Sequence, residues 1–276
     1  MRKKNIIIII LFVAAVGACV CFMLLGSSVL FLYSSKPTSI SMVIEGLNAD
    51  DEALLMYVRD NFVVPPSTKP YSLSSSKLTD PSMGQAAAAY EILNRKRNGF
   101  FVECGALDGI TRSNTYWMER HFGWKGVLIE ADPENFQLLL KKNRRAYAVP
   151  VCLSSHAHKV PFNPHFNLGK IATNKKADNA IFVQCLTLWT VMLAVNQTKT
   201  IDYFSLDVEG NEMEVLRAIP FDLLDIRVMS VEWTHVPEGK NYLRHYVESK
   251  GYVMIREVTA KNRLANDFIF AKREIL

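Results

Sequence analysis

The pattern of hydrophobic and polar positions changes at Gly99. Before this residue, helical spacing of apolar side chains predicts two helices, at 50–62 with Asp50 as a candidate N-cap and at 82–97, separated by a loop rich in Pro and Ser. After it, short apolar runs alternate with amphipathic segments. The runs predict strands at 99–104, 126–130, 146–152, 181–186, 201–208 and 227–232. The intervening segments predict helices at 114–121, 133–142, 188–196, 211–218 and 242–250.

Runs of five or six consecutive apolar residues are typical of strands that are covered on both faces of a sheet. Strands and helices that alternate through right-handed crossovers build a doubly wound α/β domain, so we expect a mostly parallel sheet. Two further strands, at 252–259 and 266–271, are expected to close this sheet as an antiparallel pair. The region 154–179 contains Pro161, Pro164 and Gly169, which predict loops with room for one hairpin.

A long uncharged stretch precedes the predicted domain, because residues 6–32 contain no charged side chain. About 20 apolar residues are enough to cross a bilayer as a helix, whereas the apolar core of a cleaved signal peptide usually has about 7–15 residues. We therefore expect an uncleaved transmembrane helix. Arg2, Lys3 and Lys4 precede it and favour a cytoplasmic N-terminus. The expected product is a single-pass type II membrane protein.

This interpretation divides the chain into a cytoplasmic N-terminus (1–5), a transmembrane helix (6–32), a stem with lead-in helices (33–98) and a luminal domain (99–276). We expect the protein to reside in the endoplasmic reticulum and Golgi, and the endosome or plasma membrane are the alternative locations. Asn196 begins an Asn-Gln-Thr glycosylation sequon, which suits that side of the membrane. In the luminal part, Cys152 and Cys185 could form a disulfide if their Cα atoms lie within about 7 Å, and Cys104 is expected to stay a buried thiol.

The net charge of +5 gives no indication of a nucleic-acid partner. Three of the 32 basic residues stand before the apolar stretch, which leaves 29 basic against 27 acidic residues in the rest of the chain. An excess of basic residues at one terminus does not form the basic surface that nucleic acids require. We therefore expect a membrane and protein partners, and no nucleic acid.

Three acidic clusters follow predicted parallel strands, where ligands bind in open α/β sheets. The first cluster contains Glu103, Gly105, Ala106, Asp108 and Gly109, the second Glu130 and Asp132, and the third Asp207 and Glu209. One acidic residue at a strand end is commonly a helix cap, but three equivalent clusters favour a binding site. Carboxylates at these places suit a nucleoside that carries hydroxyls and a cationic centre, as S-adenosylmethionine does.

Methylation of a hydroxyl requires a base within hydrogen-bond reach of the acceptor. The candidates are Asp207, Glu209 and His235, since His235 follows the strand at 227–232 near the same sheet edge. The alternative, that His235 is an ordinary loop histidine, stays open. The glycine spacing of the first cluster is not that of dinucleotide-binding proteins, and no Cys/His spacing indicates zinc.

Three segments resemble the FkbM-type methyltransferase domain: FFVECGALDG, WKGVLIEADPENF and IDYFSLDVEGNEMEVLRAI, within a match of about 99–273. The resemblance implies a class I methyltransferase fold with a seven-stranded type of sheet. It also implies that Glu103, Gly105 and Asp108 line the methionine end of S-adenosylmethionine, that Glu130 holds the ribose, and that Asp207 and Glu209 face the acceptor. The whole layout also resembles the Star-like type II membrane proteins of animals, which are associated with the transport of growth-factor precursors.

Two hypotheses for function follow. In the first, the protein is a Star-like membrane protein that accompanies cargo from the endoplasmic reticulum to the Golgi and endosome, and its methyltransferase-like domain serves as a binding module. In the second, the domain is an active S-adenosylmethionine-dependent O-methyltransferase acting on a glycan, lipid or other hydroxyl acceptor. The resemblance favours the domain type and leaves catalysis open, because a fold does not determine a function.

Overall fold

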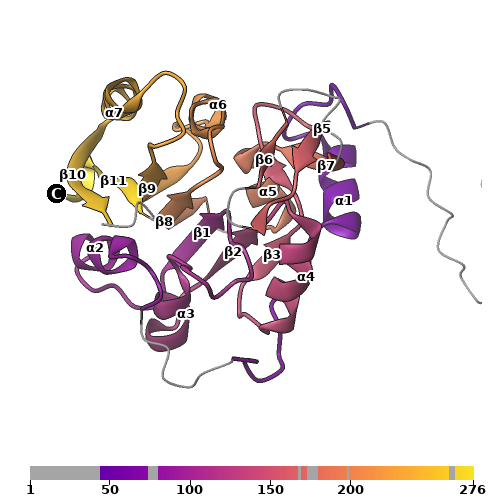
Figure 1. The fold of residues 1–276 in the computed structure, drawn as a ribbon, viewed down its shortest axis with the longest axis horizontal. Coiled ribbons are helices and arrows are strands. Elements are labelled where there is room, and N and C mark those ends of the chain that lie inside the picture. The colour runs from indigo at the N-terminus through magenta and orange to yellow at the C-terminus, as the bar shows by residue number, and fades with distance from the viewer. Residues whose placement is uncertain (1–43, 74–79, 167–168, 173–179, 198, 261–264) are drawn as a thin grey trace, which may run out of the picture. The chain divides into compact units, whose positions relative to one another are not determined.

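A computed structural model describes residues 44–276 except 74–79, 167–168, 173–179, 198 and 261–264 (Figure 1). The transmembrane helix expected at 6–32 and the N-terminal segment before it lie outside the described residues. Among the described residues, no helix is both long enough and apolar enough to cross a membrane. Residues 44–276 form one compact unit, to which the following description applies.

A seven-stranded sheet forms the centre of this unit, with strand order β10-β11-β9-β8-β1-β2-β3 (Figure 1). Its strands are β1 (Phe100–Cys104), β2 (Lys125–Ile129), β3 (Tyr147–Val149), β8 (Thr200–Leu206), β9 (Asp225–Glu232), β10 (Tyr252–Thr259) and β11 (Asn266–Lys272). The five strands from β9 to β3 are parallel, and β11 is antiparallel to both of its neighbours. The expected α/β fold with a mostly parallel sheet is therefore confirmed.

Seven α-helices accompany the sheets among the described residues. They are α1 (Glu52–Asn61), α2 (Gln85–Ile92), α3 (Tyr116–Phe122), α4 (Pro133–Lys141), α5 (Leu188–Ala194), α6 (Glu212–Ala218) and α7 (Lys240–Ser249), and a short 3₁₀ helix, η2 (Arg273–Ile275), ends the chain. The N-cap of α1 is Asp51 and not the expected Asp50, because the Asp51 carboxylate accepts hydrogen bonds from the first-turn amides. The helix expected at 82–97 is shorter than predicted and ends at Ile92.

Helices α2, α3 and α4 pack on one face of the sheet, and α6 and α7 lie on the other (Figure 1). The first face is apolar at the middle of the strands, where Phe101, Tyr203 and Val228 are fully buried neighbours. Burial of such side chains contributes roughly 25 cal/mol per Å² of apolar surface. This apolar layer fixes the strand register and so decides which polar residues meet at the strand ends.

A second, four-stranded sheet lies beside the first, with the order β4-β7-β5-β6. Its strands are β4 (Cys152–Leu153), β5 (His158–Asn163), β6 (Lys170–Ile171) and β7 (Ile181–Leu186). The single strand predicted at 146–152 is wrong in extent, because Pro150 has no N–H for a ladder and separates β3 from β4. The region 154–179, predicted as loops around one hairpin, contributes β5 and β6.

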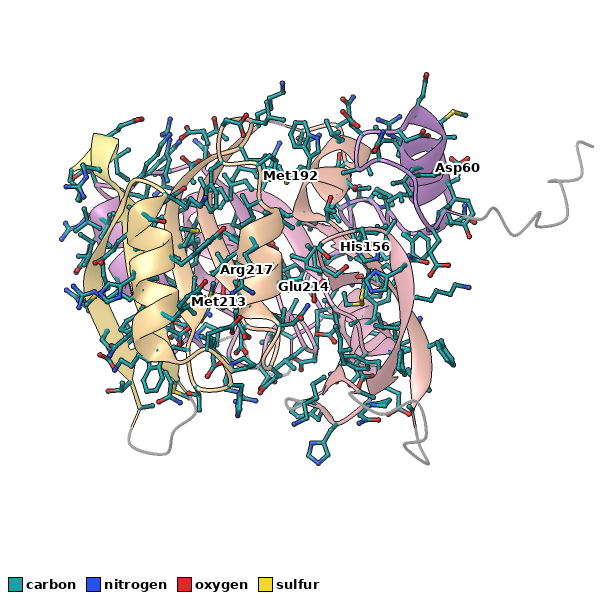
Figure 2. The ribbon with its side chains drawn as sticks, turned by 90° about the horizontal axis from the view of Figure 1, so that it is seen from above. Asp60, His156, Met192, Met213, Glu214 and Arg217 are labelled. Carbon is teal, nitrogen blue, oxygen red and sulfur yellow. A yellow bond between two sulfur atoms is a disulfide. The ribbon has the colours of Figure 1, made fainter. Side chains whose placement is uncertain are left out.

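A disulfide holds two strands of the second sheet together, and a hydrogen bond ties this sheet to the rest of the domain. Cys152 and Cys185 are opposite each other on β4 and β7 and are joined by a disulfide with a Cα–Cα distance of 4.3 Å. The Oγ of Ser155 donates a hydrogen bond of 2.8 Å to Glu214 on α6, and Figure 2 shows Glu214 beside the neighbouring His156. Cys104 is a free, buried thiol, as expected.

Candidate active site

Strand register brings the acidic clusters onto one face of the sheet. Glu103 on β1 is opposite Ser205 on β8, and Ser205 is opposite Ser230 on β9. Because side chains alternate along a strand, Asp207 and Glu232, each two residues further on, lie on this same face at the strand ends. Asp267 on the antiparallel β11 is opposite Glu232 and completes the row. The polar row therefore begins where the apolar layer beneath α2–α4 ends.

A cavity of about 160 Å³ lies at these strand ends. A single water molecule needs roughly 10–15 Å³ by this measure, so the cavity has room for a ligand group and not only for isolated water. Six of the sequence-predicted residues line it: Glu103, Gly105, Glu130, Asp207, Glu209 and His235. The other four predicted cofactor residues, Ala106, Asp108, Gly109 and Asp132, are not among the described residues that line it.

Each of these four residues has a place in the loops that surround the cavity. Asp132 is the N-cap of α4, since its carboxylate accepts hydrogen bonds from the amides of Glu134 and Asn135. Asp108 caps the turn that follows it by accepting from the amides at 110 and 111. Burial acts to raise the pKa of Asp108, but these hydrogen bonds and Lys142 together lower it. Ala106 is buried, and Gly109 turns the loop with a φ of 80°.

Glu103 is buried, and neighbouring groups already occupy its carboxylate. Its oxygens accept hydrogen bonds from the Ser113 hydroxyl at 2.8 Å, from the amide of Asn114 at 2.6 Å and from the hydroxyl of Thr115. Burial raises the pKa of Glu103, while Arg144 and these donors act in the opposite direction. The side chain therefore holds the turn at 113–115 in place, a role that the sequence did not indicate.

Glu130 directly follows the last residue of β2. Its two carboxylate oxygens accept hydrogen bonds from the amides of Leu107 at 2.7 Å and Asp132 at 2.8 Å. Burial raises the pKa of Glu130 to about 7. A carboxylate oxygen has two lone pairs, so each oxygen keeps one beyond its backbone amide; a hydrogen bond from the Asn135 side chain also acts on this carboxylate and lowers its pKa.

Gly105 allows β1 and β8 to meet beneath the cavity. Its φ of 82° lies in the left-handed region, and a Cβ atom would stand 2.1 Å from the carbonyl oxygen of Asp207. No other residue type fits this position, because the side chain would collide with backbone. The close contact sets the first and third acidic clusters side by side.

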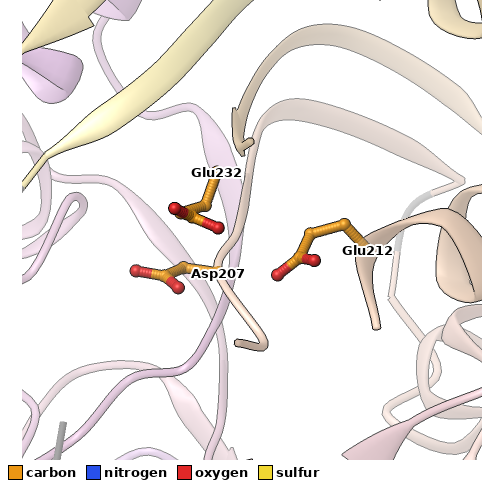
Figure 3. A group of neighbouring side chains, drawn as sticks. All are labelled: Asp207, Glu212 and Glu232. Atoms are coloured by element: carbon orange, nitrogen blue, oxygen red, sulfur yellow. The ribbon is translucent and has the colours of Figure 1, made fainter. Parts of the chain in front are cut away.

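Three carboxylates converge next to this contact: Asp207, Glu212 and Glu232 each have an oxygen within 4.8 Å of the others (Figure 3). Glu212 accepts from the amides of Val208 and Gly210, and Glu232 accepts from the amide of Thr234. Asp207 differs, because its buried Oδ1 has no hydrogen-bond partner among the described residues. Burial and the neighbouring carboxylates raise the pKa of Asp207 well above its usual value.

His235 and Glu209 form a pair at the mouth of this acidic region. The Nδ1 atom of His235 lies 2.8 Å from Glu209 Oε2 and 3.8 Å from Glu232 Oε2. Glu209 has a left-handed φ of 56°, a conformation that costs free energy in a non-glycine residue and is often found at functional sites. Burial raises the pKa of Glu209, and His235 opposes this rise. The arrangement orients the imidazole as an Asp or Glu does beside many catalytic histidines.

The sequence analysis missed two residues beside the cavity. Asn114 lines it, is only 8% exposed, and has a buried Oδ1 without a partner among the described residues. Arg144 lies behind the same loop and contacts Ser113 and Thr115 through its guanidinium nitrogens. The only signal in the sequence is the polar Ser-Asn-Thr run after the glycine-containing loop, and such a run is equally typical of a helix start.

The strand order, the antiparallel β11 and the acidic strand ends together define an α/β methyltransferase fold. A model of the methyltransferase FkbM domain matches residues 103–254, which is more than half of the chain. The chain therefore belongs to the FkbM methyltransferase domain family. A comparison with curated proteins returns no match.

Solved structures give only distant likenesses. The METTL16 methyltransferase domain is 12% identical with a TM-score of 0.43, covering 80% of this chain and 77% of its own. A methyltransferase from Pyrococcus furiosus is 14% identical with a TM-score of 0.37, covering 80% and 96%. A SAM-dependent methyltransferase from Leishmania major is 10% identical with a TM-score of 0.39, covering 79% and 81%. These scores are too low to carry an argument, so the assignment rests on the family match.

Family membership implies S-adenosylmethionine as the cofactor, and the residues of the cavity fit this molecule. Glu130 offers acceptor lone pairs to a diol, and two buried oxygens, Asn114 Oδ1 and Asp207 Oδ1, lack donors among the described residues. A cation with hydroxyl and ammonium groups supplies both the donors and the positive charge. Buried polar atoms without partners are rare in proteins, so their presence in one cavity indicates a ligand of this kind.

Proposed function

We propose that the domain is an S-adenosylmethionine-dependent O-methyltransferase in which Glu209 and His235 supply the base. The observation that carries the proposal is the 2.8 Å contact between His235 and Glu209 in the same cavity as Glu130. The bound cofactor would supply an electrophilic methyl group. His235 would accept the proton of the acceptor hydroxyl through Nε2, while Glu209 fixes the ring through Nδ1 and stabilises its protonated form.

The cofactor site is tested by calorimetry on the full-length chain with S-adenosylmethionine and S-adenosylhomocysteine. Glu130→Ala is expected to weaken binding at least tenfold, because it removes the acceptors for both ribose hydroxyls. Glu134→Ala is the matched control, since this exposed side chain lies one turn away at the start of α4. Wild-type protein that binds neither ligand at millimolar concentration would refute the enzymatic proposal.

We further propose that the domain is luminal and anchored by an apolar helix at 6–32, in the manner of the Star-like proteins that the layout resembles. Two observations support this side of the membrane. The Cys152–Cys185 disulfide is typical of an oxidising compartment, and Asn196 of the sequon is exposed directly after α5. Glycosidase treatment should shift the wild-type protein on a gel and leave Asn196→Gln unshifted. Digestion of the domain by protease in intact microsomes would contradict a luminal position.

Transport of membrane cargo, such as a growth-factor precursor, is the second candidate function, and the anchored luminal layout supports it. The two functions separate in one experiment. A Glu130→Ala/His235→Ala variant that stays folded should still support cargo export if the domain acts as a binding module. Loss of export in this variant would instead tie export to catalysis.

A further inference from the structure

We propose that Asn114 binds the α-ammonium group at the amino-acid end of the cofactor, and that Glu103 positions Asn114 for this contact. The inference rests on the proposed function and adds a binding residue to it. The ammonium group is a donor that bears a positive charge, and an amide oxygen is a suitable acceptor for it.

Glu103 is the obvious carboxylate for an ammonium group at the end of β1. Its oxygens already accept three hydrogen bonds from the turn at 113–115, and the residue is only 3% exposed. Two of these donors fill Oε2, so at most one lone pair, on Oε1, remains for a ligand. Glu103 thus serves mainly to hold the turn that carries Asn114.

Asn114 is held at two points. Its backbone N–H donates to Glu103 at 2.6 Å, and its Nδ2 donates to Ser205 Oγ at 2.9 Å. These two anchors fix the side chain so that Oδ1 is the atom left without a partner among the described residues. A buried acceptor without a donor is unfavourable, and a bound ligand that brings a donor removes this cost.

The order of the strands relates the position of Asn114 to that of Glu130. Glu130 follows β2, Glu103 and Gly105 follow β1, and Ser205 is on β8, so Asn114 and Glu130 approach the cavity from opposite sides of β1. Asn114 is bonded to Glu103 on β1 and to Ser205 on β8, and neighbouring strands are about 4.8 Å apart, so its Ser205 anchor lies about two strand spacings from β2. A cofactor whose ribose is held at Glu130 therefore extends its amino-acid chain across Gly105 toward Asn114.

The test compares two ligands that share adenosine and a neutral sulfur and differ in the amino-acid chain. S-Adenosylhomocysteine carries the ammonium group, and 5′-methylthioadenosine lacks the whole amino-acid end. Calorimetry on the full-length chain is expected to show that Asn114→Leu weakens the binding of S-adenosylhomocysteine at least tenfold. The affinity for 5′-methylthioadenosine is expected to stay within twofold of wild type. Asn114→Asp keeps an acceptor oxygen and is expected to bind S-adenosylhomocysteine within a few-fold of wild type.

The outcomes distinguish failure of the Asn114 assignment from failure of the proposed function. Unchanged binding of S-adenosylhomocysteine by Asn114→Leu, with wild type binding both ligands, would overturn this assignment alone. An equal loss of affinity for both ligands would also overturn the assignment, because this result would mean that the substitution damages the cavity in general. Wild-type protein that binds neither ligand would overturn the proposed function and this assignment together.

Discussion

The guanidinium of Arg144 lies 3.0 Å from the carboxylate of Glu119, and both side chains are almost completely buried behind the loop that follows β1. Arg144 also donates to the carbonyl of Gly109 and to the hydroxyls of Ser113 and Thr115. One buried cation therefore ties α3 to the loop that carries Asn114. The cavity depends on this support even though Arg144 and Glu119 do not line it.

Replacing Arg144 with Met should destabilise the domain by about 3–5 kcal/mol, because it leaves the buried Glu119 carboxylate without its cation. The free energy of unfolding in urea measures the effect. Lys141→Met is the control, since this side chain is exposed on α4 and its loss should change stability by no more than about 0.5 kcal/mol. Equal stability of the two variants would show that the ion pair contributes nothing.

Replacing His235 with Asn should lower kcat for methyl transfer by about 10²–10⁴, which is the usual contribution of a general base. The binding of S-adenosylmethionine should stay within about twofold, because His235 belongs to the acceptor side of the cavity. The measurement is transfer of labelled methyl from the cofactor to microsomal acceptors. His245→Asn, on the exposed face of α7, is the control and should keep full activity. A His235→Asn enzyme with wild-type kcat would exclude His235 as the base.

The sequence predicted the central sheet well, because apolar runs such as 126–130 and 201–208 are long enough to be strands and too short to be helices. It could not tell which sheet a run joins. The apolar run 181–186 became β7 of the second sheet. Its partner β5 comes from the segment 154–179, whose proline residues indicated loops, and its partner β4 begins at the end of the strand predicted at 146–152. The prediction of a strand at 181–186 was therefore correct, but the strands that pair with it were not identified.

The sequence predicted the residues of the candidate site only where chemically suitable side chains stand at the ends of predicted strands. Glu130, Asp207 and Glu209 follow strands directly, and strand order alone brings them to one edge. Asn114 could not be found in this way, because its role depends on contacts with Glu103 and Ser205, which are 11 and 91 residues away in the sequence. The acidic residues Asp108 and Asp132 have the expected position in the chain, yet local backbone amides take up their carboxylates.

Removing the Cys152–Cys185 disulfide should lower the free energy of unfolding by about 3–4 kcal/mol, because the bond closes a loop with a sequence separation of 33 residues. Urea unfolding of wild type with and without reductant measures this change. A Cys152→Ser/Cys185→Ser variant should show the lower stability in both conditions. If reductant makes the thiols of the wild-type protein reactive and leaves its free energy of unfolding unchanged, the disulfide does not stabilise the domain.

Cofactor binding should strengthen with rising pH because of Glu130. Its pKa of about 7, raised by burial, means that the carboxyl is mostly protonated at pH 6 and mostly ionised at pH 8. The ionised form can accept from both ribose hydroxyls, whereas the protonated form has lost one acceptor site to its own proton. A change of one pH unit on either side of the pKa alters the ionised fraction from about one tenth to about nine tenths, so the affinity for S-adenosylhomocysteine should rise about tenfold from pH 6 to pH 8. Glu130→Gln cannot ionise and should bind weakly with a flat pH profile, and Glu134→Gln should follow wild type. An identical rise in wild type and Glu130→Gln would assign the titration to another group.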